Sequence, residues 1–365
     1  MERIKGTNLG NWLVLEKWML PEMFDGTDAE DETWLNRTMD TKLLGERMKK
    51  HRDTYVTEET FKNIADHGLN LVRIPVPYFV FGDRPPYHGC IEYLDKAFDW
   101  AEKYNLKVLV DLHTSPGCQN SYDNGGLTGV CKFSQDPAEV EFVLSVLTRL
   151  AERYKDEPAL YGIEVLNEPI SFLVYLTAPS RKKAADPAEA KGSHHITTKF
   201  LKKFYQEAYA RLSVILPEDK KIVFHDGFRL GTWKDFFAKN GMDRAVLDTH
   251  IYIHAMEMFE PIYRPWVYRL YLWTQKCLLK RASKYTPVVV GEWSLSCRYA
   301  FDGRLEPKER TRRYRLVKQM QEKTWEVCAG DIYWSYQLNP DTRIALPAPD
   351  REPWDLHRCW DWGWM

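Results

Sequence analysis

Short runs rich in β-branched residues alternate with longer amphipathic stretches along the whole 365-residue chain. The runs that resemble strands are residues 4–9, 70–74, 107–112, 161–166, 221–225, 245–250, 287–291 and 331–334. The helix-like stretches are residues 57–67, 91–104, 137–154, 198–216, 261–284 and 307–327. Eight strands separated by helices predict parallel β/α units. We expect an α/β chain that closes as a (β/α)8 TIM barrel, since the glycine-rich phosphate turn of a doubly wound sheet is missing after the first strand.

One polar segment looks inserted into this pattern. Residues 178–195, APSRKKAADPAEAKGSHH, follow the fourth expected strand. A loop at that point lies at the mouth of a barrel, where it serves either as a solvated excursion or as a lid or dimer contact. No internal repeat or domain linker interrupts the rest. We therefore expect residues 1–365 to form one domain, with residues 178–195 as a surface insertion.

Composition narrows the classes of partner. The formal net charge is −1, which gives no reason to expect a nucleic acid or a membrane surface as partner. The seven cysteines show no CxxC spacing, so we expect free thiols in a reducing compartment and no zinc or redox framework. The chain begins without a basic-then-apolar leader and contains no apolar run of about 18 residues. These features predict a cytoplasmic protein, and nothing in the sequence indicates a cofactor.

Polar side chains gather where the expected strands leave the core. The stretch YGIEVLNEP ends in Asn167 and Glu168, and TPVVVGEWS ends with Glu292. In a β/α barrel the carboxyl ends of all strands meet at one face, so residues far apart in sequence converge there. In chain order the polar residues at strand ends are Arg73, His113, Asn167, Glu168, His250, Tyr252, Glu292 and Trp334.

Two facing carboxylates with amide and aromatic neighbours suit the hydrolysis of a glycosidic bond. One carboxyl protonates the departing oxygen, and the other meets the positive charge that develops at the anomeric carbon. The 14 tryptophans offer flat faces on which sugar rings stack. A metal site would need spacings such as HxH or HExxH, which are missing, so no metal is expected.

This ordered set of residues resembles the one in glycoside hydrolase family 5, whose members are retaining β/α-barrel glycosidases. The resemblance implies that Glu168 is the acid/base and Glu292 the nucleophile. Arg73 would keep Glu292 charged, and Tyr252 would donate a hydrogen bond to it. The remaining roles are implied for the sugar: Asn167 would bind its 2-hydroxyl, His113 and His250 would bind or position it, and Trp334 would form the floor.

Two further stretches resemble the exo-acting β-1,3-glucanase branch of that family. They are GTNLGNWLVLEKWM from Gly6 and DLHTSPGCQNSYDNGG from Asp111. The resemblance implies that Glu16, Asp123 and Asn124 hold the terminal sugar and that Tyr122 flanks the entrance to the next sugar site. Considered without the resemblance, Glu16 could instead form a surface salt bridge, and Asp123 and Asn124 could instead form a turn. The chain departs from this branch at Asn11 and Tyr122, which stand where the branch has Gly and Phe, in the 178–195 segment, and in starting without a secretion signal.

The expected function is therefore a retaining, exo-acting β-glucosidase or β-1,3-glucanase that releases terminal glucose from a small carbohydrate substrate. For this reaction Glu168 should be protonated before catalysis, so its pKa is expected to be raised by burial and by Glu292. The alternatives are an endo-acting β-glucanase or mannanase, and a glycosidase acting on an aromatic or lipid aglycone. Transglycosylation is a further possibility, and a non-catalytic carbohydrate-binding barrel would typically have lost one of the two carboxylates.

Overall fold

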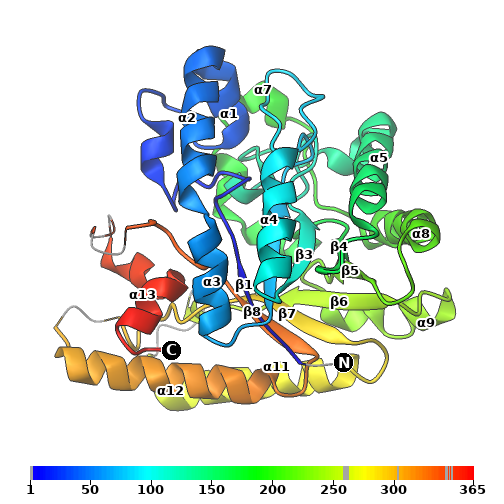
Figure 1. The fold of residues 1–365 in the computed structure, drawn as a ribbon. Coiled ribbons are helices and arrows are strands. Elements are labelled where there is room, and N and C mark those ends of the chain that lie inside the picture. Colours follow the sequence, from blue (N-terminus) through cyan, green and yellow to red (C-terminus); the bar gives the residue numbers. More distant parts are fainter. Residues whose placement is uncertain (1–2, 258–262, 302–303, 342–343, 345, 347) are drawn as a thin grey trace.

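The computed structural model describes residues 3–257, 263–301, 304–341, 344, 346 and 348–365. Its centre is a closed barrel of eight parallel strands in sequence order, with β1 hydrogen-bonded to both β2 and β8 (Figure 1). The strands are β1 (Ile4–Asn8), β2 (Leu71–Val76), β3 (Lys107–Leu112), β4 (Leu160–Glu164), β5 (Lys221–His225), β6 (Ala245–His250), β7 (Val288–Trp293) and β8 (Gly330–Tyr333). The predicted (β/α)8 barrel is confirmed.

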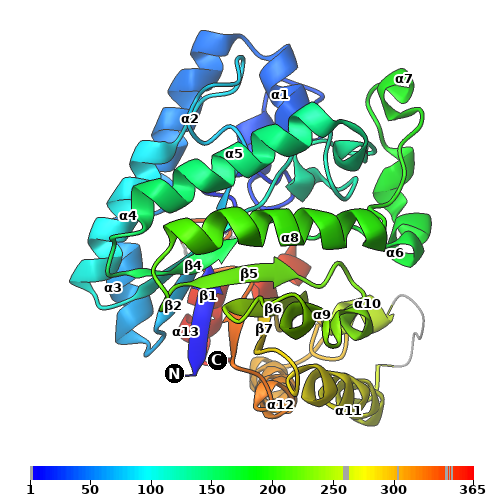
Figure 2. The same cartoon turned by 90° about the vertical axis from the view of Figure 1, so that its right-hand side faces the viewer.

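Helices surround the barrel, as Figure 2 shows from the side. The six predicted helices are present as α3 (Glu58–Asp66), α4 (Ile91–Lys103), α5 (Pro137–Tyr154), α8 (Thr198–Ile215), α11 (Pro265–Ala282) and α12 (Pro307–Trp325). Their starts follow known capping rules: Asp136 accepts hydrogen bonds from the first turn of α5, and Pro137 takes its first position. The helix predicted from residue 261 begins at Pro265, and residues 261–262 lie outside the described part.

Several helices were not predicted. Two of them, α1 (Glu32–Thr38) and α2 (Thr41–Tyr55), lie between β1 and β2, and each begins after an aspartate whose side chain caps it. The others are short: α6 (Phe172–Thr177), α7 (Pro187–Ala190), α9 (Phe236–Lys239), α10 (Ile253–Glu257) and α13 (Leu356–Asp361). No described helix combines the length and the hydrophobicity that crossing a bilayer requires.

The 178–195 segment follows β4, as predicted, and is tied down at several points. It contains a 3-10 turn (Pro179–Lys182) and α7. Arg37 of α1 holds Glu189 through two hydrogen bonds of 2.7 and 2.9 Å, and the Tyr175 hydroxyl donates to the carbonyl of Ser193. The segment thus packs against loops at the carboxyl end of the barrel.

The inside of the barrel changes from apolar to charged toward that end. An apolar layer fills the amino end and consists of Ile4, Leu71, Leu109, Val223, Val246, Val289 and Ile332. Above it lie four charged side chains without solvent exposure, Arg73, Asp111, Glu164 and Asp248. Gly291 is required beside them, because a β-carbon there would come within 2.0 Å of the Asp248 carboxylate. A buried ionic layer therefore supports whatever sits at the barrel mouth.

Candidate active site

Arg73 is the centre of the buried ionic layer. The structure places it in the middle of β2 and not at the strand end, which corrects the sequence-based position. Its guanidinium donates to Glu164 Oε2 at 2.8 Å and to Glu292 Oε1 at 3.0 Å. It also donates to Asn167 Oδ1 at 2.9 Å. With no exposed surface, Arg73 positions Glu292 and Asn167 from below.

The two glutamates implied as catalytic meet at the barrel mouth. His250 Nδ1 lies 2.8 Å from Glu168 Oε1 and 3.3 Å from Glu292 Oε2. Because both oxygens face one nitrogen, they are at most about 6 Å apart, which fits the roughly 5–5.5 Å of retaining glycosidases better than the roughly 6.5–9.5 Å of inverting ones. In β6 and β7 the register sets His250 directly beside Glu292. Glu168 has φ 46°, in the left-handed region that few non-glycine residues occupy.

The pKa of Glu168 is lowered, whereas the sequence analysis expected it to be raised. Burial by itself raises the pKa of Glu168, but the hydrogen bond and charge of His250 lower that pKa to about 2. Burial raises the pKa of Glu292, in opposition to the positive charge of His250. The expectation failed because His250 bonds the carboxylate directly. Burial would lower the pKa of His250, yet Glu292 and Asp248 raise it well above its ordinary value, so this imidazole carries the cluster's proton.

Glu292 is held from two sides. The Tyr252 hydroxyl donates to its Oε2 at 2.7 Å, and Arg73 donates to its Oε1. Glu168 is fixed by His250 on one oxygen and by the Asn124 amide on the other, at 2.9 Å. Each carboxylate is thus oriented by two donors, which fixes where its free lone pairs point.

A cavity of about 710 Å³ opens above these carboxylates. Nine of the twelve site residues singled out in the sequence line it: Glu16, Tyr122, Asp123, Asn124, Glu168, His250, Tyr252, Glu292 and Trp334. The other three, Arg73, His113 and Asn167, lie beneath it without solvent exposure. His113 is held by Asp111 at 2.5 Å, and the Asn167 amide nitrogen faces His113 Nε2 at 3.3 Å.

One wall of the cavity contains two acids with raised pKa values, Glu16 and Asp123. Glu16 is 4% exposed, which excludes the surface salt bridge, and Trp18 Nε1 donates to its Oε2 at 2.8 Å. Burial raises the pKa of Glu16 well above its ordinary value, and Asp123 raises it further. Burial likewise raises the pKa of Asp123 to about 6. Glu16 and Asp123, the one buried and the other partly buried, form no ion pair within the described part of the chain, so their oxygens are available for hydrogen bonds with sugar hydroxyls.

The loop carrying Glu16 explains the departure at Asn11. Asn11 has φ 60°, a left-handed conformation that glycine adopts freely and asparagine tolerates. Its Oδ1 accepts a hydrogen bond of 2.8 Å from the backbone nitrogen of Glu16. Asparagine therefore preserves the backbone shape that a glycine would allow and adds a bond that fixes Glu16.

Trp334 contributes an indole to the cavity wall. The indole is packed from below by Gly10, where a β-carbon would lie 2.9 Å from its ring, and it stacks on His113 with ring centres 5.6 Å apart. Such a ring offers an apolar surface against which a sugar can lie.

Other lining residues were missed by the sequence analysis. One group comes from the loops after β1 and β8 and consists of Trp18, Asp350, Arg351 and Trp354. The other group comes from the segments after β4, β5 and β6 and consists of Val174, Thr177, Pro179, Phe228, His254, Ala255 and Tyr271. The side formed by the first group is polar and indole-rich, and the side formed by the second is largely apolar. Only Trp18 lay in a motif that could have revealed it. The others lie in loops or on helices, such as α6, α10 and α11, and the sequence determines neither the course of such a loop nor the rotation of such a helix.

Two groups of buried side chains have metal-ligand types within reach of one another, Glu168–His225–His250 and Glu164–Asp248–His250. Both depend on His250, whose nitrogens already face Glu168 and Asp248. A protonated imidazole has no lone pair for a metal. The expectation that no metal binds therefore stays a prediction.

Comparison with known proteins agrees with this geometry. The family described as "Cellulase (glycosyl hydrolase family 5)" matches residues 30–209. The "Probable glucan 1,3-beta-glucosidase A" of Emericella nidulans is 36% identical over 303 residues, which cover 80% of this chain and 67% of that protein. A protein of the same name from Aspergillus terreus is 31% identical and covers 99% of this chain and 87% of that protein. The crystal structure of rutinosidase from Aspergillus niger shares the fold, with a TM-score of 0.76 at 20% identity, over 100% of this chain and 98% of that one.

The barrel, its paired carboxylates and these relatives define a glycoside hydrolase. The chain belongs to glycosyl hydrolase family 5.

Proposed function

We propose that this protein is a retaining, exo-acting β-glucosidase or β-1,3-glucanase that releases terminal glucose from β-glucan oligosaccharides or β-glucosides. The observation that supports the proposal is that a carboxylate oxygen of Glu168 and one of Glu292 lie 2.8 and 3.3 Å from the same nitrogen of His250. The two carboxylates are therefore close enough for the retaining mechanism. The substrate class follows from the curated relatives, which are named glucan 1,3-beta-glucosidases. We also propose that residues 1–365 act as one catalytic domain.

In the first step, Glu292 attacks the anomeric carbon and the bond from that carbon to the leaving oxygen breaks. Glu168 gives its proton to the leaving oxygen, so the aglycone departs as an alcohol and Glu292 becomes a glycosyl ester. Glu168 receives that proton from His250 Nδ1, 2.8 Å away. The histidine and the glutamate thus work as a pair that holds one proton.

In the second step, water attacks the anomeric carbon and releases Glu292. Glu168, now a carboxylate, takes the proton of the water and returns it to His250. The negative charge of Glu292 helps to raise the pKa of His250. Esterification removes that charge, so the pKa values of His250 and Glu168 fall and Glu168 stays ionised, ready to act as base. Two inversions leave the sugar in its β configuration.

Exo action is supported by the wall that contains Glu16 and Asp123. These acids lie beside the catalytic pair, and Asn124 links the same turn to Glu168. A sugar whose hydroxyls bind both acids meets protein there and has no room to continue as a chain. We expect laminari-oligosaccharides to be shortened to glucose only, seen by chromatography, and NMR at early times to show β-glucose. Release of larger oligosaccharides would point to endo action, and α-glucose would exclude the retaining scheme.

A second substrate class is favoured by the opposite, largely apolar side of the cavity. Val174, Pro179, Phe228 and Tyr271 offer no charged group to a second sugar. An aromatic or alkyl aglycone would bury its apolar surface there. Comparing kcat/KM for 4-nitrophenyl and octyl β-glucosides with that for laminaribiose decides between the two leaving groups.

Replacing His250 with glutamine tests the shared proton. In the native pair the proton is lost only as pH rises through the raised pKa of His250. Without the imidazole the proton must reside on Glu168, whose pKa then reflects burial without the histidine's charge. The alkaline limb of kcat/KM should therefore move to lower pH by about one unit or more.

The matched control is His113→Gln, because His113 contacts Asp111 and Asn167 but not Glu168. Its alkaline limb should stay in place even where its rate falls. An unchanged limb in His250→Gln, or equal displacement in both variants, would contradict the shared-proton mechanism.

A reducing compartment is also proposed, in line with the cytoplasmic expectation. All seven cysteines are free, and six of them are buried. Burial raises the pKa of the Cys118 thiol to about 11, which keeps it protonated and unreactive. Fractionation of cells expressing the protein at native level measures its compartment directly.

A further inference from the structure

Basic residues are concentrated on one end of the molecule. The chain as a whole has 51 basic and 52 acidic residues. In contrast, the sequence of α11, PWVYRLYLWTQKCLLKRA, holds Arg and Lys but no acid, and α12, PKERTRRYRLVKQMQEKTW, holds mostly basic charges. The two helices contact each other and lie together at the bottom of Figures 1 and 2. The near-neutral total therefore conceals a strongly basic surface.

The same surface exposes large apolar side chains. Trp266, Leu270 and Trp273 follow one another at helical spacing, and they are 61%, 55% and 63% exposed. The inward side of α11 has its own apolar residues, Tyr268 and Leu272, which are buried. Because α11 is already packed through that inward stripe, the fold does not require a second stripe that faces water.

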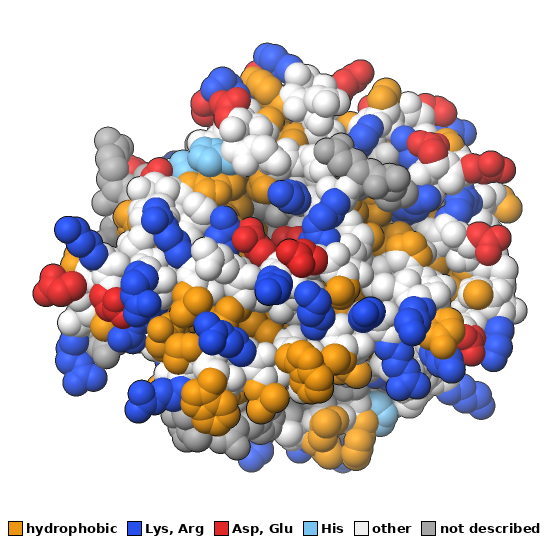
Figure 3. All heavy atoms as spheres, turned by 90° about the horizontal axis from the view of Figure 1, so that it is seen from below, with side chains coloured by type: hydrophobic (Ala, Val, Ile, Leu, Met, Phe, Trp, Pro, Cys, Tyr) orange, Lys and Arg blue, Asp and Glu red, His pale blue; other side chains and the backbone are white. Residues whose placement is uncertain are grey.

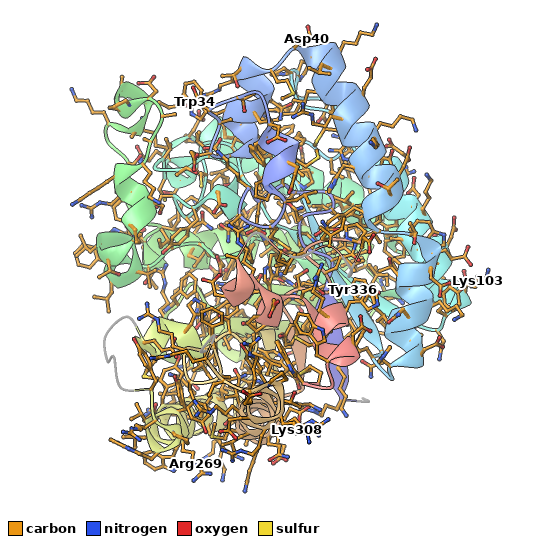
Figure 4. The ribbon with its side chains drawn as sticks, turned by 90° about the vertical axis from the view of Figure 1, so that its left-hand side faces the viewer. Trp34, Asp40, Lys103, Arg269, Lys308 and Tyr336 are labelled. Atoms are coloured by element: carbon orange, nitrogen blue, oxygen red, sulfur yellow. The ribbon has the colours of Figure 1, made fainter. Side chains whose placement is uncertain are left out.

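Cations surround the exposed stripe. In the described part of the chain, Arg269, Lys280, Arg281 and Lys284 take part in no ion pair. Arg269 of α11 and Lys308 of α12 both extend from this end of the molecule in Figure 4. Figure 3 views the end directly and shows Lys and Arg side chains interspersed with hydrophobic ones, with fewer acids. We call this the α11–α12 face.

We propose that the α11–α12 face docks on an anionic phospholipid membrane. Tryptophans favour the level of the lipid headgroups, where the indole is half in hydrocarbon and half in water, and lysines and arginines attract anionic headgroups. A second copy of the chain would bring like charges together, and a nucleic acid would leave the indole and leucine stripe in water. This proposal overrides the expectation, drawn from net charge alone, that no membrane partner exists.

Docking would also bring the α11 wall of the catalytic cavity close to the membrane. Tyr271 lies between Leu270 and Leu272 on α11 and lines the apolar side of the catalytic cavity. One helix therefore contacts the cavity with Tyr271 and presents Trp273 to the outside. The proposal does not depend on the identity of the substrate, and vesicle binding can be measured without any.

The test is co-sedimentation of the full chain with vesicles of phosphatidylcholine containing phosphatidylserine, and with vesicles of phosphatidylcholine alone. We expect binding to the anionic vesicles, lost as NaCl rises from about 0.1 M to about 0.5 M. Charge reversal in the triple variant Arg269→Glu, Lys280→Glu and Arg281→Glu should weaken binding at least about tenfold. The double variant Trp266→Ala and Trp273→Ala should weaken it by about tenfold.

Matched controls come from other faces. Lys42, Lys50 and Lys199 are exposed and unpaired within the described residues, and their reversal to Glu changes the net charge equally. Leu43 and Val214 are exposed apolar residues on α2 and α8, to be changed to Ala. Activity on 4-nitrophenyl β-glucoside without vesicles reports folding. Four results would each overturn the proposal. They are equal weakening of binding by both triple variants, absence of binding to anionic vesicles, binding to duplex DNA and not to vesicles, and a concentration-dependent dimer that needs Trp266 and Trp273.

Discussion

Changing Glu292 to alanine is expected to lower kcat/KM on β-glucosides by a factor on the order of 10⁴. The substitution removes the oxygen proposed to attack the anomeric carbon, and no other described carboxylate lies on that side of His250 except Glu168. The smaller alanine leaves space for azide. Added azide should therefore restore turnover of 2,4-dinitrophenyl β-glucoside and give the α-glucosyl azide, because a single displacement inverts the anomeric centre.

The loss should come without unfolding. Since burial raises the pKa of Glu292, its ionised form costs stability at every pH above the ordinary value of a glutamate, and alanine removes that cost. Arg73 keeps Asp111, Glu164 and Asp248 as partners. Urea unfolding at pH 7 should give a midpoint near that of the wild type. Near-native turnover, or a β-glucosyl azide product, would rule Glu292 out as the nucleophile.

The sequence predicted the barrel well because strand and helix periodicities are local signals. The limits of β3, β5 and β6 agree with prediction to the residue, and β7 exceeds it by Glu292 and Trp293. The helix α2 was missed because it is rich in lysine and arginine and buries few apolar residues. Its capping aspartate, Asp40, was the available signal.

The candidate site was predictable as a set of residues but not as a set of contacts. Nine of the predicted residues line one cavity, because parallel strands deliver their ends to one face. Whether a polar residue lies in the cavity or under it depends on how near it is to the carboxyl end of its strand. Arg73 is in the middle of β2 and lies under the cavity, whereas Glu292 is near the end of β7 and lines it. The register that sets His250 beside Glu292 is a pairing across strands, so its effect on both pKa values could not be foreseen.

The apolar side of the cavity shows the same limit. Phe228 has φ 56° in the turn after β5, and Tyr271 reaches the cavity from α11. Neither position belongs to a motif, and each arrives through the course of a loop or the rotation of a helix. Consequently the terminal sugar could be proposed from sequence, whereas the character of the leaving-group side required the structure.

Changing Glu168 to alanine should produce losses that depend on the leaving group. Donating a proton matters most when the departing alcohol is a poor leaving group, so kcat/KM on laminaribiose should fall by about 10³-fold or more. With 2,4-dinitrophenyl β-glucoside, whose phenolate leaves without a proton, the first step should stay fast. The second step then lacks its base, so a burst of dinitrophenol followed by slow turnover is expected in stopped-flow absorbance.

Azide and stability separate this variant from Glu292→Ala. Azide needs no general base and attacks the glycosyl ester, so Glu168→Ala should yield the β-glucosyl azide. The low pKa of Glu168 means that its ionised form stabilises the fold above the ordinary glutamate value, a contribution lost only as pH falls toward about 2. At pH 7 Glu168→Ala should therefore unfold at lower urea than Glu292→Ala. The isosteric Glu168→Gln keeps the side-chain volume but has a single acceptor oxygen, so it can keep only one of the two bonds donated by Asn124 and His250, and it controls for packing. Equal losses on both substrates, with no burst and no azide product, would mean that Glu168 does not transfer the proton.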